Sequence, residues 1–173
     1  LSCAKAFMTT DTFPKGAGWT GEIGDAPVSI AGIAKGSGVI APNMATMLAF
    51  IVTDLDASHT SLQKCLSKAN AQTFNCISID GDMSTNDTVI LLANGESSSS
   101  IDDDLILEHA FQEALTLISE ILAKKIVSDG EKITKVVTLE INGCSTYENA
   151  EKVARAIGNS LLVKASFYGS DPN

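Results

Sequence analysis

A threonine that follows a small residue at the head of an apolar run is the residue best suited to covalent chemistry. This residue is Thr46, in the stretch Asn43–Phe50 (NMATMLAF). A threonine hydroxyl needs a base, and no side chain near Thr46 in the sequence is an obvious one. One mechanism supplies its own base: the hydroxyl attacks the preceding carbonyl, the peptide is cut, and the freed α-amine activates the same hydroxyl. An α-amine pKa of about 7.7 to 8.0 suits this role. Threonine is also common in strands, so a structural role stays open.

Lys35 is a second candidate, because it lies in the glycine-rich run Gly32–Gly38. The glycine spacing matches neither a phosphate-binding loop nor a dinucleotide fingerprint. Close backbone packing explains the glycines. A lysine between two apolar segments lies either at a strand end in water or at a ligand, and the sequence leaves both interpretations open.

Other polar residues indicate structure rather than chemistry. The run Asp80–Asp87 alternates oxygen ligands as a calcium loop does, but it lacks the glycine and glutamate that such a loop needs at its sixth and twelfth positions. It reads better as a tight polar turn. His59 and His109 fall on expected helices without a metal-ligand spacing. We therefore expect no metal and no resident cofactor.

Composition and charge exclude some classes of function. The 173 residues can form one core or two small lobes. The chain is 45% hydrophobic but only 5% aromatic, which is typical of an ordinary α/β or α+β protein. A formal charge of −9, from 21 acidic and 12 basic side chains, argues against binding to nucleic acid or an anionic membrane.

The cysteines and the chain ends give expectations about the cellular compartment and about the length of the complete protein. The four cysteines have no CxxC spacing, which predicts free thiols in a reducing compartment rather than a zinc site; they are Cys3, Cys65, Cys76 and Cys144. No apolar run reaches the ~20 residues of a membrane span. With no signal-like segment, a cytoplasmic location is expected. Leu1 is not an initiator, and we expect both ends to be cut from a longer protein.

The elements around Thr46 are predicted to be strands followed by a helix. Val28–Ile33 and Thr46–Thr53 are rich in β-branched and small apolar residues, which predicts two strands. A helix follows, capped by Asp56 or Ser58. Its apolar positions at helical spacing are Leu62, Cys65, Leu66 and Ala69.

The middle of the chain is predicted to hold a further strand and a long helix. Phe74–Ile79 reads as a short strand, Thr88–Ala93 as a strand or the start of a helix, and Gly95–Ser100 as a surface loop. A long helix then begins after Asp102–Asp104 and ends near Lys124, with charges placed as the helix dipole favours. Its apolar stripe is Leu107, Phe111, Ala114, Ile118, Ile121 and Leu122.

The last part of the chain continues the alternation. After a turn at Asp129-Gly130, Lys135–Ile141 alternates as a strand, Tyr147–Ile157 is an amphipathic helix, and Leu161–Tyr168 reads as a last strand. The sequence therefore predicts an α/β (α+β) fold in which helices cover one or two sheets.

Four ordered motifs resemble the ornithine acetyltransferases, and together they span nearly the whole chain. They are Met8–Lys15 (MTTDTFPK), Ile33–Phe50, Asp80–Thr88, and a tail formed by Leu162–Lys164 and Gly169–Asn173. The family is the bifunctional glutamate N-acetyltransferase of arginine biosynthesis. The resemblance implies a self-cleaving N-terminal-threonine acyltransferase sandwich.

The resemblance implies a cut between Ala45 and Thr46. Residues 1–45 would then be the end of an α chain and residues 46–173 most of a β chain. Thr46 would accept acetyl from N-acetylornithine, release ornithine, and pass the acetyl group to glutamate. Paired chains of this family form larger hetero-oligomers. Acetyl-CoA is a donor for some members only, and the sequence does not decide whether it is one here.

The resemblance also assigns the family's substrate-binding residues to positions in this sequence. Thr9 is the first threonine of the TTDT run, and the sequence does not distinguish it from Thr10. Lys35 lies eleven residues before Thr46, and Glu131 follows the Asp-Gly turn. A lysine and a threonine suit the substrate's α-carboxylate, and a glutamate suits its amino group.

The chain departs from the family pattern in three places. Lys132-Ile133 separate Glu131 from Thr134-Lys135, where the family has one small residue, usually glycine. The family's oxyanion pair would lie before Leu1, and two residues that close the site would lie beyond Asn173. We therefore expect low activity from this chain alone. A related self-cleaving aminopeptidase or amide hydrolase, and a non-catalytic fragment, are the alternatives.

Overall fold

One mixed β-sheet organises the described part of the chain. The computed structural model of the protein describes residues 2–37, 47–81, 84–130 and 132–172. Within them the sheet has four strands in the order β1-β2-β3-β4. The strands are β1 (Lys15–Ile23), β2 (Ala26–Lys35), β3 (Leu48–Thr53) and β4 (Thr88–Ala93). β1 and β3 each pair antiparallel with β2, whereas β4 pairs parallel with β3.

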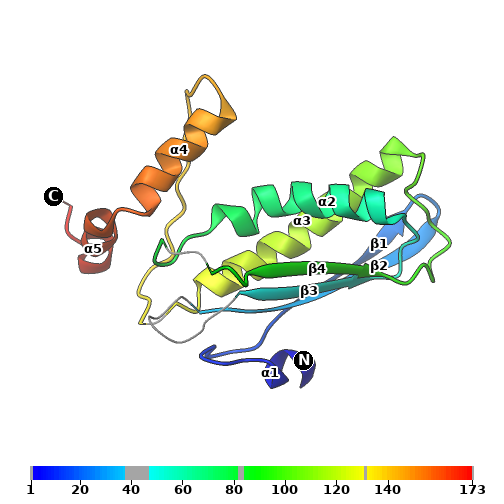
Figure 1. Cartoon of the computed structure of the whole chain (residues 1–173), viewed down its shortest axis with the longest axis horizontal. Helices are drawn as coiled ribbons and strands as arrows, with labels where there is room; N and C mark the ends of the chain where they lie inside the picture. The colour runs from blue at the N-terminus through cyan, green and yellow to red at the C-terminus, as the bar shows by residue number, and fades with distance from the viewer. Residues whose placement is uncertain (1, 38–46, 82–83, 131, 173) are drawn as a thin grey trace.

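Helices cover one face of this sheet. α2 (His59–Gln72) and α3 (Leu105–Val127) lie across it side by side, while α1 (Ser2–Ala6) lies on the opposite side (Figure 1). A short 3-10 helix, η1 (Phe74–Cys76), follows α2. α4 (Tyr147–Gly158) and α5 (Leu161–Gly169) lie beyond one end of the sheet (Figure 1). The predicted mixed α/β class, with a sheet covered by helices, is confirmed.

The core forms between the sheet and α3. β2 alternates, so that Val28 and Ile30 are buried while Ser29 between them is exposed, as the two-residue period of a strand requires. The face of α3 that meets the sheet is fully buried at Phe111, Leu115, Ile118 and Leu122. The predicted apolar stripe is therefore confirmed at Phe111, Ala114, Ile118 and Leu122, whereas Leu107 and Ile121 are only partly buried and Leu115 was not predicted.

Side-chain caps fix where the two covering helices begin. Ser58 accepts a hydrogen bond from Ser61 N at the start of α2, so of the two predicted caps Ser58 is the one used. Asp104 accepts from Ile106 N and Leu107 N at the start of α3. The long helix was therefore predicted with the correct acidic start.

The close approach of α3 to β2 depends on Gly32. A Cβ at this position would lie 2.8 Å from Leu122 Cδ1 and 3.3 Å from Ile118 Cγ2, and both side chains are fully buried. We expect Gly32→Ala to lower the free energy of unfolding by about 1 to 3 kcal/mol, because the added methyl overpacks the core. Gly18→Ala is the matched control, because the nearest atom would be Ile30 O at 3.9 Å. Urea unfolding of both variants measures the difference, and equal stabilities would contradict the packing argument.

In the first half of the chain, one predicted strand is wrong and one segment left open between strand and helix is now decided. Phe74–Ile79 was predicted as a strand, which is wrong: η1 continues directly from α2, and Phe74 turns into the core. Thr88–Ala93, left open between strand and helix, is β4. β1 was not predicted, since glycines at Gly16, Gly18 and Gly21 hide its alternation.

Two predicted strands near the C-terminus are also wrong. Lys135–Ile141 is irregular, with Val136 and Val137 exposed, because no described strand lies beside it to satisfy its backbone. Leu161–Tyr168 belongs to α5, which Ser160 caps by accepting from Val163 N. A helix satisfies its own backbone groups, so it needs no neighbouring strand. Tyr147–Ile157 is confirmed as α4.

All four cysteines are free thiols, as predicted. Within the described residues, no helix combines the length and the apolar character needed to cross a membrane.

Candidate active site

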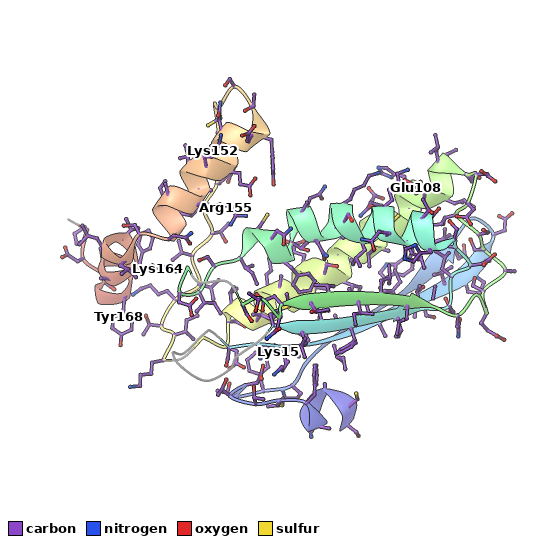
Figure 2. All side chains as sticks on the ribbon, viewed as in Figure 1. Lys15, Glu108, Lys152, Arg155, Lys164 and Tyr168 are labelled. Atoms are coloured by element: carbon purple, nitrogen blue, oxygen red, sulfur yellow. The ribbon has the colours of Figure 1, made fainter. Side chains whose placement is uncertain are left out.

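The described chain beside each predicted site residue reaches one end of the sheet. β1 begins there at Lys15, opposite Ala34 near the end of β2. Lys35, the last residue of β2, is opposite Leu48, the first residue of β3. Leu48 is in turn opposite Thr88, where β4 begins. Figure 2 labels Lys15 at this end of the sheet, which is also where α3 ends.

Thr46 and Ala45 lie outside the described residues, but the chain directly after them is well anchored. Met47 N donates to Asp87 Oδ1 at 2.9 Å, and Met47 O accepts from Thr88 N at 3.0 Å. These bonds fix the start of β3 against the loop that precedes β4. The residue that follows the candidate nucleophile is therefore held on both sides of its peptide unit.

Lys35 is almost completely buried, with 9% of its surface exposed. The interpretation of this lysine as a strand end in water is therefore wrong. Within the described ranges we find no ion pair or hydrogen bond to its ammonium group. A buried ammonium group suits the anionic group of a ligand.

The TTDT loop lies against the chain that follows Lys35. The hydroxyls of Thr10 and Ser37 are 2.6 Å apart and share a hydrogen bond. Thr9 is exposed, and its backbone N–H donates to Asp11 Oδ2 at 3.2 Å. The structure thus brings Thr9 and Lys35 to the same end of the sheet. The sequence alone could not distinguish the roles of Thr9 and Thr10. In the structure the Thr10 hydroxyl is hydrogen-bonded to Ser37, whereas Thr9 is held through its backbone.

Glu131 lies outside the described residues, but the turn before it is tied to the TTDT run. Asp129, 4% exposed, accepts from Thr12 N at 2.9 Å and from the Thr12 hydroxyl. Gly130 is also buried. The described chain on the N-terminal side of Glu131 therefore reaches the same end of the sheet as Thr9 and Lys35.

A buried ionic cluster, which we call the Asp11–Lys15–Asp129 cluster, joins these segments. Lys15 Nζ donates to Asp11 Oδ1 at 2.5 Å and to Asp129 Oδ2 at 2.6 Å. The three side chains are 0%, 1% and 2% exposed for Lys15, Asp11 and Asp129. Asp11 Oδ1 also accepts from Gly36 N at 2.8 Å. The cluster contacts the segments next to all three expected substrate residues.

Sequence reasoning missed this cluster. Asp11 and Lys15 are four residues apart in a motif that was noted only for its resemblance, so their pairing left a local signal. Asp129 is 114 residues from Lys15 and was read as part of a turn. A contact at that separation leaves no mark in a single sequence.

The acid groups of the cluster stay ionised in the folded protein. Burial alone would raise the pKa of Asp11, but hydrogen bonds from Gly36 N, Lys15 and Thr9 N outweigh it and lower the pKa below 3.8. For Asp129, burial is likewise outweighed by hydrogen bonds from Lys15 and Thr12, so its pKa is lowered as well. Both carboxylates therefore stabilise the folded state at pH values above their unfolded pKa, where they are ionised.

These pKa shifts predict acid sensitivity. A carboxylate with a lowered folded pKa stabilises the fold fully above its unfolded pKa near 3.8, and that contribution is lost as the pH falls toward the folded value. We expect the free energy of unfolding to decline from about pH 5 downward. Asp129→Asn should decline less steeply, because it has one titrating carboxyl fewer. Urea unfolding at several pH values measures both slopes, and parallel curves would contradict the assignment.

Two of the other motifs also meet. Lys164, in the tail motif and labelled in Figure 2, donates from Nζ to Ile79 O. Ser78 donates to Asn159 Oδ1 at 2.7 Å beside this contact. The helical C-terminal segment thus holds the chain that enters the Asp80–Asp87 run, of which residues 82 and 83 lie outside the described part.

The comparison with known proteins decides the family. A sequence profile of the ArgJ family matches residues 1–173. The chain belongs to the ArgJ family. This membership confirms the resemblance carried by the four motifs.

Curated relatives agree with this assignment. The chain is 48% identical over 174 residues to a glutamate N-acetyltransferase of Methanococcus maripaludis, a match that covers 99% of this chain and 42% of the relative. It is 47% identical over 173 residues to the arginine biosynthesis bifunctional protein ArgJ of Caulobacter vibrioides, covering 98% and 42%. The chain therefore spans less than half the length of these ArgJ relatives.

A solved ArgJ structure has a similar fold. The crystal structure of arginine biosynthesis bifunctional protein ArgJ from Bacillus halodurans matches with a TM-score of 0.69 and 42% sequence identity. The match covers 74% of this chain and 61% of that one. The ArgJ fold therefore holds for most of the chain described here.

Proposed function

We propose that the complete protein carrying this chain is an acyltransferase of arginine biosynthesis that moves acetyl from N-acetylornithine to glutamate. The observation that supports this most is the nearly buried Lys35, which lies at the sheet end where the chain after Thr46 is anchored. A buried ammonium suits the carboxylate that both amino-acid substrates carry. The names of the ArgJ relatives agree with this substrate class.

Maturation comes first in the proposed sequence of steps. The Thr46 hydroxyl attacks the Ala45 carbonyl carbon, the C–N bond breaks, and water hydrolyses the resulting ester. The products are a carboxylate at Ala45 and a free α-amine at Thr46. Residues 1–45 and 46–173 then belong to separate α and β chains, which remain associated as a hetero-oligomer.

Acetyl transfer follows in two halves. The Thr46 amine takes the proton of its own hydroxyl, whose oxygen attacks the acetyl carbon of N-acetylornithine, and ornithine leaves after accepting a proton. The glutamate amine then attacks the acyl-threonine ester, forming N-acetylglutamate and restoring the hydroxyl. Thr9 and Lys35 hold the substrate carboxylate and Glu131 holds the amino group, in the roles that the family resemblance gives them.

Transfer of isotope-labelled acetyl tests this function. The complete translated product is incubated with labelled N-acetylornithine, with and without glutamate. We expect label in N-acetylglutamate and an equal amount of ornithine. Label found only as free acetate would instead indicate a hydrolase, and no release of label would indicate a non-catalytic protein. Labelled acetyl-CoA, offered as the donor in a second reaction, decides whether that donor is also used.

Mass spectrometry of the same material tests maturation. Two chains that meet at Ala45 and Thr46 are expected. For the 173 residues alone, a single species at 18.1 kDa would show that this chain is not cut by itself.

A further inference from the structure

We propose that the Asp11–Lys15–Asp129 cluster positions the substrate-binding residues. It does so through the charges of its side chains rather than through the space that they fill. This inference rests on the proposed function, because Thr9, Lys35 and Glu131 have their roles from it. Lys15 would be a positioning residue, since its ion pairs are with Asp11 and Asp129 rather than with a residue that binds substrate.

The hydrogen bonds of the cluster reach each of these segments. Asp11 accepts from Thr9 N at 3.2 Å and from Gly36 N at 2.8 Å, so one carboxylate joins Thr9 to the residue after Lys35. Asp129 accepts from Thr12 N at 2.9 Å and lies two residues before Glu131. The two carboxylates thus hold three separate parts of the chain by their backbones.

Lys15 joins the two halves of this arrangement. Its single ammonium nitrogen lies 2.5 Å from Asp11 Oδ1 and 2.6 Å from Asp129 Oδ2. An ammonium has three donors, so it can serve both carboxylates at once. Without it, the TTDT loop and the turn after α3 would still be linked through Thr12, but the two carboxylates would repel each other.

The burial of its three charged side chains indicates that the cluster has a role beyond stabilising the fold. The three side chains are at most 2% exposed, and together they carry one net negative charge. Removing charges from water is costly, and apolar replacements of buried ion clusters are often as stable or more stable. An apolar or neutral set of side chains could therefore fill this space. A neutral set would lack the ammonium that holds both acceptor groups in place, so the acceptors of Gly36 N and Thr12 N would no longer be fixed.

The triple variant Asp11→Asn/Lys15→Met/Asp129→Asn separates positioning from stability. It removes every charge of the cluster at nearly constant volume and leaves no buried charge unpaired. In the complete protein we expect a thermal midpoint close to that of the wild type. The KM for N-acetylornithine, measured on the cut protein, should rise at least about tenfold, whereas a purely structural role would leave it unchanged. Amide exchange at Thr12 and Gly36 should be faster.

Two further variants keep the test decisive. Lys64→Met/Glu108→Gln is the matched control, because it removes a partly exposed ion pair between α2 and α3, away from the cluster, with a distance of 2.7 Å; it should change neither KM nor amide exchange. If the triple variant does not fold, Asp129→Asn alone replaces it, with the same expected direction. A folded variant with wild-type KM overturns the inference, whatever its amide exchange at Thr12 and Gly36.

The outcome is distinguishable from failure of the proposed function. If the wild type transfers no acetyl group, the proposed function fails, and the role assigned to the cluster in substrate binding fails with it. If the wild type transfers acetyl and the folded triple variant does so with unchanged KM, only the positioning inference fails.

Discussion

Thr46→Ala is expected to leave one uncut chain and to abolish acetyl transfer. Alanine has no hydroxyl to attack the Ala45 carbonyl, so the peptide bond stays intact and no α-amine is released at position 46. The variant lacks both the nucleophile and its base. Loss of a covalent nucleophile typically lowers kcat by about 10⁴-fold or more. Denaturing gel electrophoresis and the labelled-acetyl assay measure the two effects on the same preparation.

The matched control for this variant is Thr60→Ala. Thr60 is exposed on α2, far in sequence from the cut, so the same chemical change there should alter neither cleavage nor transfer. Thr46→Ser gives a second comparison, because serine keeps a hydroxyl and should be cut and acylated. Cleavage that persists in Thr46→Ala would mean that another residue is the nucleophile.

The predictable part of the fold is the part whose residues interact locally. The stripe of α3 and the cap at Ser58 follow from helical spacing and from side-chain hydrogen bonds within a few residues. β1 was missed because its glycines carry no side-chain alternation to read. Leu161–Tyr168 has strand-like composition, yet it forms α5, because strand formation depends on a neighbouring strand that no composition reveals.

The candidate site shows the same division. Lys35 was recognised from its unusual position among small residues, and its burial now removes one of its two interpretations. Asp129 was read as a turn residue, although it binds Lys15 across 114 positions in sequence. Such a contact exists only because β1 begins where α3 ends. Residues that act on a substrate can leave a motif, whereas residues that hold a motif in place are visible only in three dimensions.

Lys35→Met is expected to raise the KM for N-acetylornithine with a smaller effect on kcat. Methionine fills similar space but cannot pair with a carboxylate. A hydrogen bond to a charged group contributes about 1.5 to 3 kcal/mol, which corresponds to a roughly 10- to 150-fold weaker interaction. The carboxylate takes no part in bond making or bond breaking, so the lost binding is shared by ground state and transition state and appears in KM. Steady-state kinetics with varied N-acetylornithine measures this split.

The same substitution is expected to affect stability in the opposite direction to substrate binding. Because Lys35 is only 9% exposed, its charge is largely removed from water, which costs free energy in the unliganded protein. Lys35→Met should therefore keep or raise the thermal midpoint while it weakens substrate binding. A loss of stability would instead show that the ammonium has a structural partner.

Lys124→Met is the matched control, because it breaks an exposed pair with Glu120 at 2.5 Å, and such surface pairs contribute little. Its kinetics and its thermal midpoint should both stay near those of the wild type. Self-cleavage should persist in Lys35→Met, since the cut uses no substrate carboxylate. A cut, folded Lys35→Met protein with wild-type KM would place the substrate carboxylate elsewhere and remove the main support for the proposed site.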